Sequence, residues 1–222
     1  LIDIITQTSI GRKVALGIGG LALAGGAVAG PATVTQTESP TTSVPILQAQ
    51  AKPSAKEVGF DYQRQPNYFY CGPASARMAL TANGHELSQD EIAEKLGTTT
   101  NGTDSAEDIT KALNDVIGER AYDTVEIPGE AATEEQTEKL RADIVDAIAD
   151  GDPVVANIIG TATDVDGNEH SYPGGHYLTV VGYRDDGHTV KIADPYETRG
   201  DGTYWMSTSD LADWIASRGY SA

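Results

Sequence analysis

Two continuous apolar runs, Val154–Ile159 and Tyr177–Tyr183, dominate the second half of the sequence. Short runs of this kind are typical of strands buried inside a sheet. A turn at Asp185–Gly187 follows the second run and leads into another short apolar stretch, Thr189–Ala193. With a further short strand at Thr203–Met206, this order predicts a meander of antiparallel strands.

The first half of the sequence carries helix-start signals instead. Ser88 with Glu91, and Thr133 with Gln136, have the spacing of a capping box, in which two side chains satisfy exposed backbone N–H groups. Helices followed by strands indicate an α+β fold. The expected helices span residues 74–82, 88–96, 105–117, 133–150 and 209–217, the expected additional strands span 59–62 and 124–127, and 162–175 is expected to be a polar connection.

Composition narrows the class of protein. Of the 222 residues, 39% are hydrophobic and 22% are charged, which is typical of a soluble globular domain. The single cysteine excludes an intramolecular disulfide framework, so the domain depends on its core. The net charge of −18 argues against binding to nucleic acid or to anionic membranes, because both reward basic patches.

The N-terminal segment, residues 1–32, has the pattern of an export signal. Arg12 and Lys13 supply positive charge, Val14–Gly26 is apolar, and Ala27–Ala29 offers small residues for cleavage. The alternative is a retained membrane anchor, for which the apolar run is short. We therefore expect a secreted or extracytoplasmic protein without stable membrane insertion after cleavage.

Residues 33–57 are rich in Thr, Ser, Gln, Pro and Ala, and have too few apolar residues to fold alone. We expect them to form a flexible linker or a pro-segment. The folded domain is then expected to span residues 58–222.

The only cysteine, Cys71, precedes Gly72 and Pro73 at the start of a helix-forming stretch. The N-terminus of a helix stabilises a thiolate through free N–H groups and the helix dipole. Gln65, six residues upstream, is close enough to place an amide donor beside the sulfur. The alternative reading is a buried structural cysteine.

A cysteine nucleophile needs a base, and the sequence has four histidines. His85, His170 and His188 lie in polar turn or loop sequence, whereas His176 opens the strongest predicted strand. Asp194 ends the next strand, so antiparallel pairing brings it to the same end of the sheet as His176. The alternatives are a structural histidine and an aspartate that only forms a turn before Pro195.

These residues carry a family resemblance. Gln65-x5-Cys71-Gly72-Pro73-Ala74, Gly175-His176-Tyr177 and Asp194-Pro195 resemble papain-like cysteine peptidases, most of all the double-glycine-leader peptidases and their stand-alone secreted relatives. The Gly151–Val155 and Val180–Tyr183 stretches are also similar to that family.

The resemblance implies a papain-like α+β fold with Cys71 as nucleophile, His176 as general base and acid, Asp194 as the orienting residue and Gln65 as oxyanion donor. It implies hydrolysis of peptide or amide bonds in a peptide or protein substrate through a thioester on Cys71, without metal or cofactor. We expect a monomer. Two alternatives stay open: an amidase or acyl transferase on cell-wall peptides, and a non-catalytic peptide-binding domain.

Asp164-x-Asp166-x-Asn168 lacks the Gly and Glu of a calcium loop, so we expect a polar hairpin there.

Overall fold

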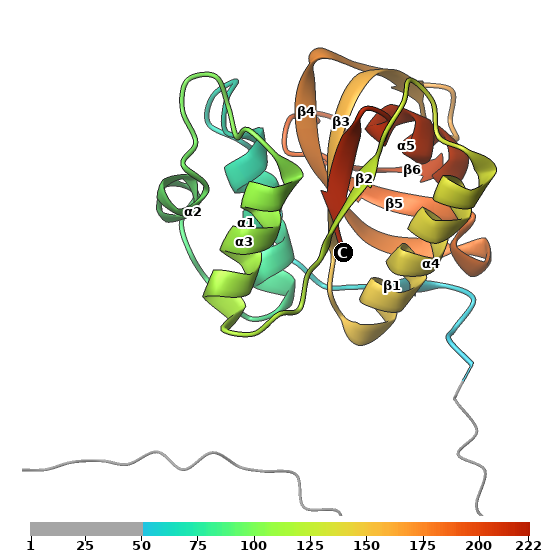
Figure 1. Ribbon diagram of the computed structural model, residues 1–222, viewed down its shortest axis with the longest axis horizontal. Helices are drawn as coiled ribbons and strands as arrows, with labels where there is room; N and C mark the ends of the chain where they lie inside the picture. The colour runs from blue at the N-terminus through green and yellow to red at the C-terminus, as the bar shows by residue number, and fades with distance from the viewer. Residues whose placement is uncertain (1–50) are drawn as a thin grey trace, which may run out of the picture. The chain divides into compact units, whose positions relative to one another are not determined.

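The computed structural model describes residues 51–222 (Figure 1). The expected export signal, residues 1–32, and residues 33–50 of the expected linker lie outside this part of the chain. Within residues 51–222, none of the helices combines the length and the apolar character needed to cross a membrane.

A single antiparallel sheet forms the larger part of the fold. Its strands are ordered β2-β7-β3-β4-β5-β6, and β1 pairs with β4 beside this path. The run β3–β6 is the expected meander, and its register is set locally by short connections. The strands are β1 Lys56–Glu57, β2 Thr124–Ile127, β3 Val154–Thr163, β4 Glu169–Arg184, β5 Thr189–Ala193, β6 Thr203–Ser207 and β7 Arg218–Ser221.

Within residues 51–222, five α-helices accompany the sheet, and all but α1 begin at a side-chain cap. Both expected capping boxes are present, and Ser105 forms a third one with Asp108. The helices are α1 Cys71–Ala82, α2 Gln89–Leu96, α3 Ala106–Ile117, α4 Glu134–Asp150 and α5 Thr208–Ile215, with the short 3-10 helix η1 Asp185–Gly187 between β4 and β5.

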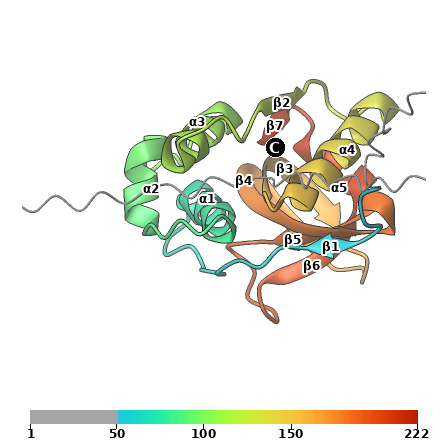
Figure 2. The same cartoon turned by 90° about the horizontal axis from the view of Figure 1, so that it is seen from below.

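The helices divide into two groups with separate cores. In Figures 1 and 2, α1, α2 and α3 lie together on one side, and α4 and α5 pack against the sheet away from them. Leu140, Ile144 and Ile148 of α4 are fully buried in the core under the sheet. The core of α1–α3 reaches the sheet through Val155 and Tyr177. The junction between the two groups is therefore where α1 meets β4.

Two sequence expectations about strands are wrong. The segment Gly59–Tyr62 is irregular, and the first strand lies earlier, at Lys56–Glu57, where it pairs with Gly182 and Tyr183. Residues 162–175 are not a connection, because they form the arms of the β3–β4 hairpin around a turn at 164–168. Their polar and glycine-rich composition suits strands that project beyond the core.

The end of the chain also differs from expectation. The last helix ends at Ile215, not at Ser217, and Arg218–Ser221 then forms β7 between β2 and β3. The sequence of β7 has no apolar alternation. Its pairing with β2 and β3 is long-range, and that information is absent from the local pattern.

Candidate active site

Cys71 is the first residue of α1. No side chain caps this helix, so the N–H groups of its first turn are left to act on the sulfur. Gly72 is required here, because a Cβ at that position would lie 2.4 Å from Oγ1 of Thr103. Cys71 is only 8% exposed and lines a cleft.

His176 faces Cys71 from β4. The sequence predicted that His176 would open this strand, but β4 begins at Glu169 and His176 lies within it. Tyr172 pairs with Gly160 and His176 pairs with Ile158, so residues 173–175 bulge out opposite one residue of β3. A bulge of this kind re-aims the side chain that follows it. It also accommodates a proline that could not donate to the ladder.

Asp194 comes directly after β5 and is completely buried. Its Oδ1 accepts hydrogen bonds from Nε2 of His176 at 2.8 Å and from the backbone N–H of Tyr196 at 2.9 Å. Its Oδ2 accepts from the hydroxyls of Tyr172 at 2.8 Å and Tyr204 at 3.2 Å. With Nε2 bonded to Asp194, Nδ1 is the ring nitrogen left for the sulfur.

The three groups shift one another's ionisation. Burial raises the pKa of the Cys71 thiol, but hydrogen bonding to His176, its positive charge and backbone hydrogen bonds from Tyr177 and Gly72 bring that pKa below its ordinary value. Burial lowers the pKa of His176, but bonds to Asp194 and Cys71 raise it to about 9. Burial raises the pKa of Asp194, but the hydrogen bond to His176 and the positive charge of that ring outweigh burial. The pKa of Asp194 therefore lies below its ordinary value. Together these shifts favour a thiolate, an imidazolium and a carboxylate at neutral pH.

Gln65 is buried close to this group, but it is not bonded to the sulfur. Its backbone N–H donates to the carbonyl of Pro195 at 3.0 Å, and its Nε2 donates to the carbonyl of Asn67 at 2.7 Å. Its Oε1 is buried without a partner among the described residues. The structure thus places Cys71 and His176 in one cleft, bonds His176 to Asp194, and holds Gln65 beside the end of β5.

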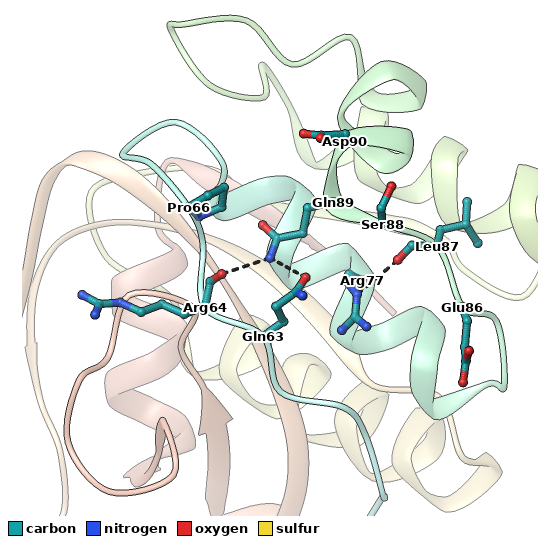
Figure 3. A pocket seen from close by; sticks show the side chains of 9 residues that line it. All are labelled: Gln63, Arg64, Pro66, Arg77, Glu86, Leu87, Ser88, Gln89 and Asp90. Carbon is teal, nitrogen blue, oxygen red and sulfur yellow. Dashed lines mark hydrogen bonds between the residues drawn. The ribbon is translucent and has the colours of Figure 1, made fainter.

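The segment that carries Gln65 is held by hydrogen bonds beside a cavity of about 560 Å³ (Figure 3). Gln89, at the start of α2, donates from Nε2 to Oε1 of Gln63 at 2.8 Å and to the carbonyl of Arg64 at 3.0 Å. Neither Cys71 nor His176 lines this cavity, so it is not the catalytic cleft. The bonds from Gln89 anchor the segment that carries Gln65.

The cavity that contains Cys71 and His176 has a volume of about 370 Å³. Its walls come from the aromatic run before Cys71, from the loop that precedes α3, from the bulge of β4 and from β7. The remaining lining residues are Tyr68, Phe69, Thr100, Asn101, Gly102, Thr103, Asp104, Asn157, Gly174, Gly175, Tyr177 and Arg218. Among residues 51–222, no group of His, Cys, Asp and Glu side chains is arranged to hold a metal ion.

Two tyrosines of the site were missed by sequence reasoning. Tyr172 stacks on the ring of His176 at 3.9 Å between centroids while its hydroxyl binds Asp194. Tyr204 supplies the second hydroxyl from β6. Tyr172 belongs to the segment expected to be a connection, so no strand register was available to place it.

His170 is also placed differently from the expectation of a polar loop. It is 4% exposed, stacks on Tyr204 at 3.9 Å and bonds through Nε2 to Asp164 at 3.1 Å. Asp164 also accepts from the backbone and side chain of Asn168, so its carboxylate closes a polar hairpin turn, as expected.

A cysteine at the start of a helix, packed against an antiparallel sheet that carries the histidine and the aspartate, defines the papain-like cysteine peptidase fold. The chain belongs to the Peptidase_C39 like family, whose model matches residues 57–222. This match confirms the resemblance and the fold class expected from the sequence. Among curated proteins, none matches the chain significantly.

The chain is also similar to several solved structures, at low sequence identity. The peptidase domain of Streptococcus ComA, a bifunctional ABC transporter involved in a quorum-sensing pathway, is 18% identical over 75% of this chain and 96% of its own, with a TM-score of 0.49. A double-glycine-motif protease of an AMS/PCAT transporter in complex with the leader peptide is 14% identical over 75% and 91%, with a TM-score of 0.45. Xylellain, a cysteine protease from Xylella fastidiosa, is 13% identical over 77% and 86%, with a TM-score of 0.44.

Proposed function

We propose that this protein is an exported cysteine peptidase that hydrolyses peptide or amide bonds. The observation that carries the proposal is that Cys71 and His176 line one cleft while Nε2 of His176 bonds to the buried carboxylate of Asp194. A structural cysteine has no need of a histidine whose pKa is raised to about 9 beside it. Export rests on the N-terminal sequence alone, and we propose that the folded domain acts as a monomer.

The geometry supports acyl transfer to water. The Cys71 thiolate attacks the carbonyl carbon, and the C–N bond breaks as His176 gives its proton to the leaving amine. A water molecule that loses a proton to His176 then hydrolyses the thioester and frees the sulfur. Asp194 keeps the imidazole ring oriented and stabilises its positive charge in both steps.

The pH dependence of Cys71 alkylation tests the nucleophile. We expect iodoacetamide to label the protein rapidly at pH values well below the ordinary thiol pKa of about 8.5, because His176 stabilises the thiolate. In His176→Ala only burial and the backbone bonds remain, so labelling should require a higher pH. Since Cys71 is the only thiol, the rate of mass increase reports on it alone. Labelling that follows an ordinary thiol in both proteins would leave the peptide-binding domain as the better reading.

Hydrolysis itself is measured on peptide and cell-wall-fragment libraries, because the same three residues serve a peptidase, an amidase and an acyl transferase. Free acid products support a hydrolase. Transfer to an added amine without such products would support the transferase alternative instead.

Replacing Gln65 tests the oxyanion site. If its free Nε2–H and the backbone N–H of Cys71 bind the oxyanion, Gln65→Ala should lower kcat by about 10²–10³-fold with little change in KM. Labelling of Cys71 should be much less affected, because Gln65 makes no bond to the sulfur in this structure. Glu86→Ala is the control, because Glu86 is exposed in the loop before α2 and its side chain makes no hydrogen bond or ion pair within residues 51–222. Equal kcat values for Gln65→Ala and Glu86→Ala would exclude the role.

A further inference from the structure

Arg218 lies where two cavities of the protein meet. It lines the catalytic cleft and also a larger cavity, of about 1180 Å³, between α3 and the strands β2 and β7. Asp104 and Asn157 are shared by the two cavities as well. The shared walls indicate one groove that runs from Cys71 past Arg218 and along α3.

The guanidinium of Arg218 has no partner within residues 51–222. No ion pair joins it to a carboxylate of this part of the chain, and its Nε is buried without a hydrogen-bond acceptor. Buried donors of this kind are rare in folded proteins. Two other acidic side chains of the groove are already engaged, since Asp123 pairs with Arg120 and Asp108 caps α3 at Ser105.

The backbone on both sides holds Arg218 at the cleft. Ser217 adopts a left-handed conformation, with φ of 64°, and its N–H donates to the carbonyl of Ile127 at 2.8 Å. Gly175, directly before His176, has φ of 91°, and a Cβ there would lie 3.8 Å from Nη2 of Arg218. A strained non-glycine residue that persists beside a cleft is a common mark of a functional position.

We propose that Arg218 binds a carboxylate of the substrate close to the bond that Cys71 attacks. This inference rests on the proposed function and specifies its substrate class. The planar guanidinium presents paired N–H donors that match a carboxylate. The carboxylate is either an Asp or Glu side chain or the free C-terminus of the peptide. The acidic residues Asp104, Glu107 and Glu126 line the same groove, so the preference for negative charge is confined to one substrate position.

Peptides with one defined carboxylate test this proposal. Three sets are compared: end-capped peptides with a single Glu moved along the sequence, neutral peptides with a free C-terminus, and fully capped neutral peptides. We expect wild-type protein to prefer one of the first two sets in kcat/KM by about 10- to 100-fold over the third. Arg218→Met should bring that ratio close to one. Arg120→Met, in the same groove, is the matched control and should keep the wild-type ratio.

Binding separates this proposal from the proposed function. With Cys71→Ala protein, which is not required to turn over, isothermal titration should show tighter binding of the preferred carboxylate peptide than of its neutral match. That difference should vanish when Arg218→Met is added. Arg218→Glu should reverse it in favour of a Lys-containing peptide, provided that circular dichroism and thermal unfolding match the parent protein. Peptide binding that responds to Arg218 without any turnover in wild type would overturn only the peptidase assignment. An unchanged carboxylate preference in folded Arg218→Met would overturn the role of Arg218.

Discussion

Replacing His176 by alanine should lower kcat for peptide hydrolysis by about 10⁴-fold or more, and Cys71→Ala should lower it at least as far. Cys71 supplies the atom that forms the thioester. His176 both stabilises the thiolate and carries the proton to the leaving amine, so its loss removes two contributions at once. The proposed nucleophile and base act as one unit, because His176 lowers the pKa of Cys71 and Cys71 raises the pKa of His176.

The combined variant makes this expectation sharper. If the two residues act together, Cys71→Ala/His176→Ala should be no slower than the worse of the single variants. If the two residues contributed independently, the fold-losses in kcat of the single variants would multiply in the double variant. The measurement is kcat on the best library peptide, with product detected by mass spectrometry. His188→Ala is the matched control, because His188 is exposed and lies on the far end of η1 from the site. Full activity in folded Cys71→Ala would exclude Cys71 as the nucleophile.

The sequence predicted the parts of the site that depend on short-range structure. Cys71 begins a helix because Gly72 and Pro73 suit a first turn. Asp194 meets His176 because β4 and β5 are joined by a tight turn, so their pairing leaves little choice of register. Both inferences needed only neighbours in the chain.

The parts that sequence reasoning missed depend on distant pairing. The bulge at residues 173–175 exists only because β3 lies opposite, and it sets the orientation of both Tyr172 and His176. Arg218 reaches the cleft because β7 inserts between β2 and β3. Segments far apart in the sequence determine these contacts, and no local pattern encodes them.

Asp194→Asn should keep the fold but lower kcat/KM at pH 7 by about 10²–10⁴-fold and shift its pH profile. The reason lies in the donors around the carboxylate. Oδ1 faces the backbone N–H of Tyr196, which can only donate, and Nε2 of His176, which donates while the ring is protonated. Oδ2 faces the hydroxyls of Tyr172 and Tyr204, which can rotate and accept. The new amide nitrogen is therefore expected on the tyrosine side.

With that orientation the asparagine oxygen still accepts from Nε2 of His176, so the ring stays in place while the negative charge is lost. The pKa of about 9 results from bonds to Asp194 and Cys71 that outweigh burial. Removing the charge lets burial lower that pKa, so His176 loses its proton at a lower pH. The basic limb of the kcat/KM profile, which should lie near 9 in wild type, is therefore expected to move down in Asp194→Asn.

Asp194→Ala should be far more damaging, because it leaves buried donors without an acceptor. We expect the free energy of unfolding to fall by about 3–5 kcal/mol, measured by urea denaturation. Asp166→Asn, on the exposed β3–β4 turn, is the matched control for the loss of one carboxylate. It should change neither the free energy of unfolding nor the basic limb of the kcat/KM profile. A basic limb that stays near 9 in Asp194→Asn would show that the charge of Asp194 does not hold the proton on His176. The orienting role would then belong to the two tyrosines and to the bulge that positions the ring.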